Sequence, residues 1–218
     1  MVGVAPCQCF SPGGNHTTSP GLISSLGLLV LDETCRQMAE WDRLLGAAAP
    51  PRANVNVSAL QLDSNLAEQV ADALARHALT PDRISVEITE SALMKDPQSA
   101  RQVLDELRAL GVQLAIDDFG TGYSSLAYLR RLPVDCLKVD RSFVAELAAG
   151  HAEIATAVID LAGTLNLCTV AEGVETAEQV QALSDLGATY LQGFSLARPM
   201  DGRSATNFFA TRQGELIR

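Results

Sequence analysis

Short apolar runs alternate with helical segments along most of this chain, and this alternation restricts the fold more than any other feature. Six runs are typical of strands and cover residues 53–58, 83–89, 112–117, 136–139, 168–171 and 189–194. Apolar residues at helical spacing occupy residues 22–45, 66–77, 100–110, 124–131, 153–165, 177–186 and 204–211. Mostly apolar strands separated by helices predict a parallel sheet that helices cover, so the fold class is α/β, either a (β/α) barrel or a doubly wound sheet.

The length of the chain sets a second limit on the fold. A chain of 218 residues has room for one domain with a full core. Residues 1–20 are rich in Gly, Pro, Ser and Thr and contain no Asp, Glu, Lys or Arg. We therefore predict an irregular N-terminal tail over 1–20 and a barrel domain over 21–218. Six strands are fewer than the eight or so of a closed barrel.

The charge of the chain excludes some partners. With 26 acidic and 16 basic side chains the formal net charge is -10, which argues against duplex DNA and anionic membranes as partners. An anionic small ligand stays possible if a local charge reverses the field. No basic segment opens the chain, and the apolar stretch 21–31 is shorter than the roughly 20 residues that span a bilayer. We expect a cytoplasmic protein.

The five cysteines show no spacing typical of a metal site. Cys136 and Cys168 each lie in an apolar run. The pattern predicts buried, unpaired thiols in a reducing compartment.

Polar side chains gather where the predicted strands end. In chain order they are Asn56, Glu87, Glu90, Asp117, Asp118, Lys138, Asp140, Glu172, Glu175 and Gln192. In a parallel barrel the carboxyl ends of the strands meet at one mouth, where active sites are built. Carboxylates gathered there repel one another unless cations lie between them. Oxygen ligands without nearby His or Cys suit Mg²⁺, Mn²⁺ or Ca²⁺, and paired metal ions commonly serve phosphodiester cleavage.

Each of these residues also has an ordinary structural interpretation. A carboxylate at a strand end can cap the next helix, and Asp140 fits that role well. Asn56 can be a turn residue, and Lys138 can form a structural ion pair. The loop 120–125 can be a tight turn, since an isolated Gly-x-Gly is a weak phosphate signal. A functional site is favoured because all six strands deliver polar groups to the same end.

Six segments follow one another in an order that identifies a family. They are Asn56–Ser58, Glu87–Ser91, Asp117–Leu126, Lys138–Phe143, Ala171–Thr176 and Gln192–Phe194. Together they resemble the EAL domain family of bacterial cyclic di-GMP phosphodiesterases, over about residues 21–199. The resemblance implies a modified TIM-type (β/α)8 barrel that here lacks the first one or two strands. It also implies hydrolysis of cyclic di-GMP to linear pGpG with Mg²⁺ or Mn²⁺, in members that often form homodimers.

The resemblance assigns roles residue by residue. The metal ligands are Asn56, Glu87, Asp117, Asp118 and Glu172, and the catalytic residues are Lys138 and Glu172. Glu90 holds the active-site loop from Asp118 to Ser125. The loop and substrate positions are Gly120, Thr121, Gly122, Tyr123, Ser124, Asp140, Glu175 and Gln192.

One feature of the family is missing from the printed sequence. The signature Glu-Ala-Leu segment provides a metal ligand and is followed by a substrate-binding arginine, yet residues 1–20 contain neither Glu nor Arg. We therefore expect a truncated barrel with weakened metal binding and reduced turnover. Its open edges favour dimerisation, instability or cover by the segment Val2–Ala5. Two alternatives remain: a non-catalytic module that binds cyclic di-GMP or a protein, and a broken fragment or misplaced gene start.

Overall fold

The computed structural model describes residues 3–4, 20–122 and 126–211. In this part of the chain, all strands join one parallel sheet with the order β1-β7-β6-β5-β4-β3-β2. The strands are β1 (Gly3–Val4), β2 (Ala53–Val57), β3 (Ile84–Thr89), β4 (Gln113–Phe119), β5 (Cys136–Val139), β6 (Cys168–Ala171) and β7 (Tyr190–Leu191). From β2 to β7 the order follows the sequence without the reversal that a doubly wound sheet requires. The sheet is therefore of the barrel type.

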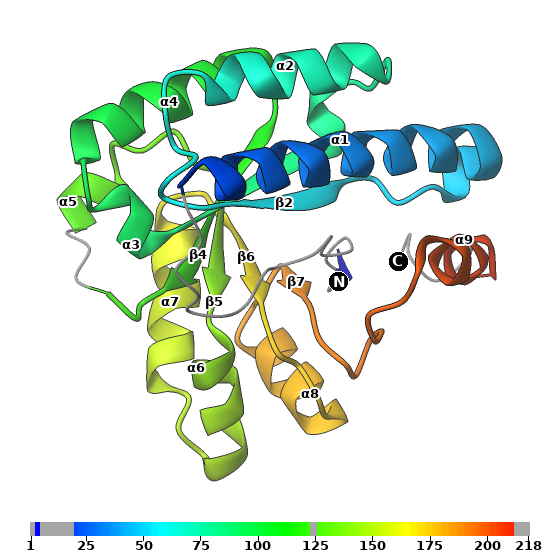
Figure 1. Cartoon of the computed structure of the whole chain (residues 1–218). Helices are drawn as coiled ribbons and strands as arrows, with labels where there is room; N and C mark the ends of the chain where they lie inside the picture. Colours follow the sequence, from blue (N-terminus) through cyan, green and yellow to red (C-terminus); the bar gives the residue numbers. More distant parts are fainter. Residues whose placement is uncertain (1–2, 5–19, 123–125, 212–218) are drawn as a thin grey trace.

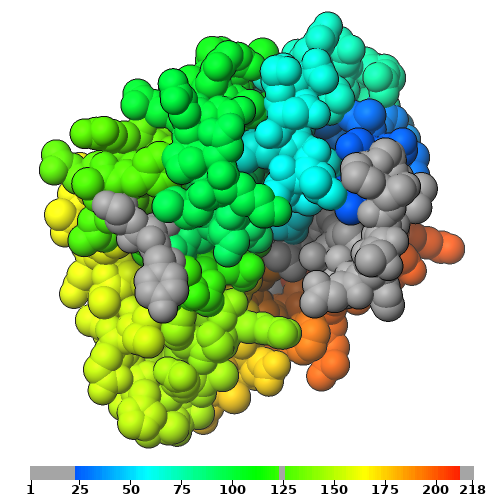
Figure 2. Space-filling model, turned by 60° about the vertical axis from the view of Figure 1, so that its left-hand side comes forward, coloured from blue at the N-terminus to red at the C-terminus, as the bar shows by residue number. Residues whose placement is uncertain are grey.

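Helices lie around the curled sheet (Figure 1). They are α1 (Pro20–Leu45), α2 (Leu66–Arg76), α3 (Glu90–Leu93), α4 (Pro97–Leu110), α5 (Leu126–Leu129), α6 (Arg141–Glu146), α7 (Glu153–Thr164), α8 (Ala177–Asp185) and α9 (Gly202–Thr211). In the space-filling view, the cyan and green parts of the chain lie above its yellow-green part (Figure 2). Within the described residues, no helix combines the length and hydropathy that a membrane-spanning segment needs.

The predicted fold class is confirmed, with differences at individual elements. All six predicted strands form, but the strand predicted over 189–194 is reduced to the two residues of β7. The short helices α3 and α6 lie where no helix was predicted. The pairing expected of the segment Val2–Ala5 is confirmed for Gly3 and Val4, which pair in parallel with Tyr190 and Leu191. One edge of the open sheet is therefore extended by β1.

The two faces of the sheet bury different side chains because strand residues alternate between faces. Leu114, Ile116, Leu137 and Val139 belong to the large core between sheet and helices. The inner face holds a separate, smaller apolar cluster of Ala115, Cys136 and Val170, with Cys168 packed against it. Asp117 and Lys138 follow two residues after Ala115 and Cys136 on that same face. The inner face thus carries small apolar side chains first and charged side chains nearer to the carboxyl ends of the strands.

Helix α1 shows how the helices attach to this sheet. Its buried residues Leu31, Cys35, Met38 and Trp41 recur at intervals of three and four, so they form one stripe that faces the core. The indole nitrogen of Trp41 donates a 2.9 Å hydrogen bond to the Thr206 hydroxyl of α9. These contacts join the two ends of the domain.

The prediction of unpaired cysteines is wrong for two residues. The register of β5 and β6 places Cys136 opposite Cys168, and the structure joins them in a disulfide. Cys35 is a free, buried thiol, as predicted, while Cys7 and Cys9 lie outside the described residues. The pair could not be predicted because strand register depends on how the intervening chain packs.

We expect Gly193→Ala to destabilise the protein, because a Cβ at residue 193 would collide with the backbone nitrogen and oxygen of Val174. The melting temperature should fall by about 4–8 °C, equivalent to about 2 kcal/mol. The control is Gly163→Ala on α7, where a Cβ would meet no atom within 4 Å. This change should add about 0.5–1 kcal/mol of stability, since alanine favours helix more than glycine does. Equal effects of the two substitutions would contradict the close packing at Gly193.

Candidate active site

Polar residues predicted for the site lie at or near the carboxyl ends of neighbouring strands. The register pairs Asn56 with Glu87 and Thr89 with Asp117 across β2, β3 and β4. Lys138 lies on β5 opposite Val170 of β6. Glu172 follows Val170 by two residues. Because all strands run in the same direction, these side chains approach one another on the inner face.

Lys138 is at the centre of this group. Its side chain is completely buried. Its Nζ lies 2.7 Å from Glu87 Oε2, 3.1 Å from Asp117 Oδ1 and 2.5 Å from Glu172 Oε1. Three carboxylates therefore share one ammonium group. If all three are ionised, the group retains an excess of two negative charges.

The excess of carboxylates shifts their protonation. Burial raises the pKa of Glu87 to about 7, and the charge of Lys138 offsets this only in part. Burial also raises the pKa of Glu172, again against the opposing effect of Lys138. Burial alone would lower the pKa of Lys138, but the charges of Glu87, Glu172 and Asp117 outweigh it and the pKa is raised. Lys138 is therefore a permanent cation at neutral pH.

A backbone irregularity brings two consecutive aspartates to the same site. Successive strand residues normally point to opposite faces. Here the pairing of β4 with β5 shifts register between Ile116 and Phe119, and Asp118 has a φ of 53°, which is uncommon outside glycine. Carboxylate oxygens of Asp117, Asp118 and Glu172 consequently lie within 4.8 Å of one another. Burial, followed by the charge of Asp117, raises the pKa of Asp118.

The donor set fits a divalent cation. Glu87 is 1% exposed, and its Oε1 has no hydrogen-bond partner among the described residues. Such a buried, unpaired oxygen is costly unless a further partner binds. The oxygen ligands gathered beside it are those that hard divalent ions prefer. The group Asp117, Asp118 and Glu172 is thus a candidate metal-binding site.

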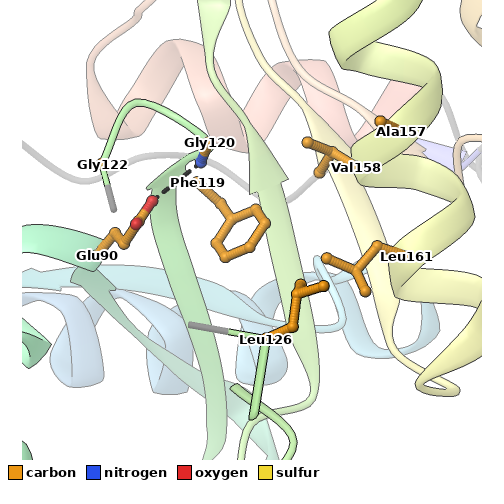
Figure 3. A pocket seen from close by; sticks show the side chains of 8 residues that line it. All are labelled: Glu90, Phe119, Gly120, Gly122, Leu126, Ala157, Val158 and Leu161. Atoms are coloured by element: carbon orange, nitrogen blue, oxygen red, sulfur yellow. Dashed lines mark hydrogen bonds between the residues drawn. The ribbon is translucent and has the colours of Figure 1, made fainter. Parts of the chain in front are cut away.

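Glu90 fastens the loop that follows β4. Its Oε2 accepts a 3.0 Å hydrogen bond from the backbone nitrogen of Gly120, as Figure 3 shows. Gly120 has a φ of 96°, and a Cβ at Gly122 would lie 2.7 Å from Glu90 Oε1. Thr121 donates its hydroxyl to the Asp118 carbonyl at 2.8 Å. Tyr123 and Ser124, also predicted for this loop, lie outside the described residues.

The other predicted residues occupy the same end of the sheet in different ways. Asp140 is the N-cap of α6, where its carboxylate accepts the backbone N–H of Ser142 at 2.9 Å, so the capping interpretation is confirmed. The Gln192 backbone donates to Ala171 and accepts from Val174, while its Oε1 is buried without a hydrogen-bond partner in the described part of the chain. Glu175 is exposed.

Sequence reasoning missed Gln179 as a positioning residue. It is buried, its Nε2 donates to the Val144 carbonyl at 3.1 Å, and its Oε1 accepts the backbone N–H of Glu175 at 2.8 Å. Gln179 therefore holds the loop that leaves Glu172. The capping box Thr176-x-x-Gln179 is a sequence signal that could have found it.

Comparisons with known proteins agree with this geometry. The family model described as the EAL domain matches residues 15–199. The bifunctional diguanylate cyclase/cyclic di-GMP phosphodiesterase MucR of Pseudomonas aeruginosa is 50% identical over 183 residues, which are 83% of this chain and 26% of MucR. The chain belongs to the EAL domain family. It spans about a quarter of the length of the curated relatives it matches.

Solved structures show the same fold. The PaMucR phosphodiesterase in complex with c-di-GMP has a TM-score of 0.81 at 48% identity, covering 85% of this chain and 75% of that one. The EAL domain of Mycobacterium smegmatis DcpA has a TM-score of 0.82 at 42% identity, covering 87% and 86%. A manganese and cyclic di-GMP complex of Klebsiella pneumoniae BlrP1 has a TM-score of 0.69 at 30% identity, covering 78% and 43%.

Replacing Lys138 by methionine should destabilise the metal-free protein strongly. The substitution keeps an unbranched side chain but removes the ammonium group, so Glu87, Asp117 and Glu172 lose their shared cation. Loss of one partner from a buried ion pair typically costs about 3–5 kcal/mol. The matched control is Lys95→Met, the other lysine of the sequence, which is exposed and should change stability by about 0.5 kcal/mol or less. Urea denaturation in EDTA measures the free energy of unfolding of both variants. Similar losses of stability in the two variants would contradict the role of Lys138.

The stability of the metal-free protein should depend on the protonation of Glu87. The folded state holds this proton to about pH 7, whereas the ordinary pKa is 4.5. Stability from protonated Glu87 is therefore present at low pH and is lost as pH rises from about 4.5 to about 7. Over this range the wild type should lose about 3 kcal/mol more stability than Glu87→Gln. If the free energy of unfolding depends on pH in the same way in the two proteins, Glu87 has an ordinary pKa and the prediction is wrong.

Proposed function

We propose that this chain is a cyclic di-GMP phosphodiesterase that hydrolyses one phosphodiester bond of cyclic di-GMP to give linear pGpG. The observation that carries the proposal is the fully buried Lys138 within a group of carboxylates at the strand ends. The name of MucR and its solved complex with the dinucleotide support the choice of substrate.

The proposed metal is Mg²⁺ or Mn²⁺, held by Asn56, Glu87, Asp117, Asp118 and Glu172. The unpaired Oε1 of Glu87 and the close oxygens of Asp117, Asp118 and Glu172 support this ligand set. A bound divalent ion would stabilise negative charge on the phosphate and lower the pKa of a coordinated water. The manganese complex of BlrP1 supports the class of metal.

The chain's own residues prepare this site. Lys138 holds Glu87, Asp117 and Glu172 in position and reduces their mutual repulsion. The Glu90 carboxylate fixes the loop at Gly120, which keeps Asp118 at the mouth. We propose that Asp140, Glu175 and Gln192 line the substrate side. Homodimerisation stays a prediction.

The test is an assay of the purified chain with Mn²⁺, in which chromatography measures the conversion of cyclic di-GMP to pGpG. Asp117→Asn should lower the rate by about 100-fold or more, because it removes a negative oxygen from the metal site. The matched control is Asp105→Asn on the exposed face of α4, which should leave the rate unchanged. EDTA should abolish turnover, and added Mn²⁺ should restore it.

Absence of pGpG above the Asp117→Asn background would refute the enzymatic proposal. Calorimetric titration with cyclic di-GMP would then separate the remaining alternatives. Binding without turnover would indicate a receptor module, and absence of binding would leave a protein-interaction role.

A further inference from the structure

Two cysteines lie side by side on the inner face of the sheet. Cys136 of β5 and Cys168 of β6 are register partners, and their Cα atoms are 4.5 Å apart. This separation lies within the range found for disulfides, so the backbone needs no rearrangement to join the two sulfur atoms.

The pair lies directly beneath the charged group. Because alternate residues of a strand share a face, Cys136 lies on the face that Lys138 uses two residues later, and Cys168 on the face that Glu172 uses four residues later. Their packing with Ala115 and Val170 confirms this placement. Cys136 is 5% exposed, while Cys168 is half-buried, so small oxidants and reductants can approach the pair from the side of Cys168.

We propose that Cys136 and Cys168 form a reversible thiol–disulfide pair, a redox-modification site that ties β5 to β6 beneath the charged group. With hydrogen peroxide as the oxidant, one cysteine thiol loses its proton and its thiolate attacks a peroxide oxygen. The O–O bond breaks, a sulfenic acid forms, and the released hydroxide takes up the thiol proton to give one water. The second thiol attacks the sulfenic sulfur, and a second water leaves as the S–S bond forms. Two thiols and one peroxide thus give one disulfide and two waters. A dithiol reverses the reaction by thiol–disulfide exchange and is itself oxidised.

The bond has a mechanical consequence for the site. It connects residues that are 32 positions apart in sequence and encloses α6 and α7, the helices between the two strands. A covalent link of this kind restricts the unfolded chain and stabilises the folded one. Oxidation should therefore stabilise the strand pair that carries Lys138 and leads to Glu172.

The test compares peroxide-treated and dithiothreitol-treated protein by non-reducing peptide mapping and thermal denaturation. All proteins carry Cys7→Ser and Cys9→Ser, so that other thiols do not react. The oxidised chain should yield a linked peptide containing Cys136 and Cys168. Its melting temperature should exceed that of the reduced chain by about 5–10 °C.

Three variants separate the pair from other causes. Cys136→Ser and Cys168→Ser should each lose both the linked peptide and the temperature difference. Cys35→Ser should keep both, because Cys35 is buried in α1 and burial raises its pKa to about 11, which keeps the thiol unreactive.

The proposal is overturned if the chain that keeps both Cys136 and Cys168 forms no linked peptide under peroxide. It is also overturned if the oxidised and reduced chains melt at the same temperature. The comparison on the Cys136/Cys168 chain stands even if a serine variant fails to fold. None of these measurements uses cyclic di-GMP or a metal, so their outcome is independent of the proposed phosphodiesterase.

Discussion

The ammonium group of Lys138, buried among carboxylates, is the constraint on which the rest of this structure depends. Removal of a charge from water costs several kcal/mol unless partners replace the solvent. Glu87, Asp117 and Glu172 replace it here at 2.5–3.1 Å, but they bring more negative charge than Lys138 can balance. Protons or metal cations must balance the remainder. Folding stability, carboxylate protonation and metal binding are therefore linked at one site.

Backbone features around Lys138 complete the site. The register shift between β4 and β5 and the positive φ of Asp118 turn two consecutive aspartates toward the same centre. Gln179 holds the loop after Glu172 through the backbone of Glu175, and Glu90 holds the loop after Asp118 at Gly120. The strands thus supply Glu87, Asp117 and Asp118, and a fastened loop supplies Glu172.

Much of this arrangement could be predicted from the sequence because it depends on local patterns. Apolar runs and helical spacing predicted six strands, and their parallel direction predicted that Lys138 would meet the carboxylates. Non-local features could not be predicted. The pairing of Cys136 with Cys168 depends on strand register. The short strand β7 is followed by Gly193, which packs against Val174. The position of Asp118 depends on a bulge. Metal-binding roles, including that of Asn56, come from family resemblance and stay predictions.

Anomalous X-ray diffraction from crystals soaked in Mn²⁺ tests the central claim most directly, since it locates the cation without reference to activity. The account predicts an anomalous peak within coordination distance of Asp117, Asp118 and Glu172. In the same crystals Lys138 should still pair with Glu87, Asp117 and Glu172. An anomalous map with no peak at these residues, recorded from fully soaked crystals with Lys138 in place, would contradict it.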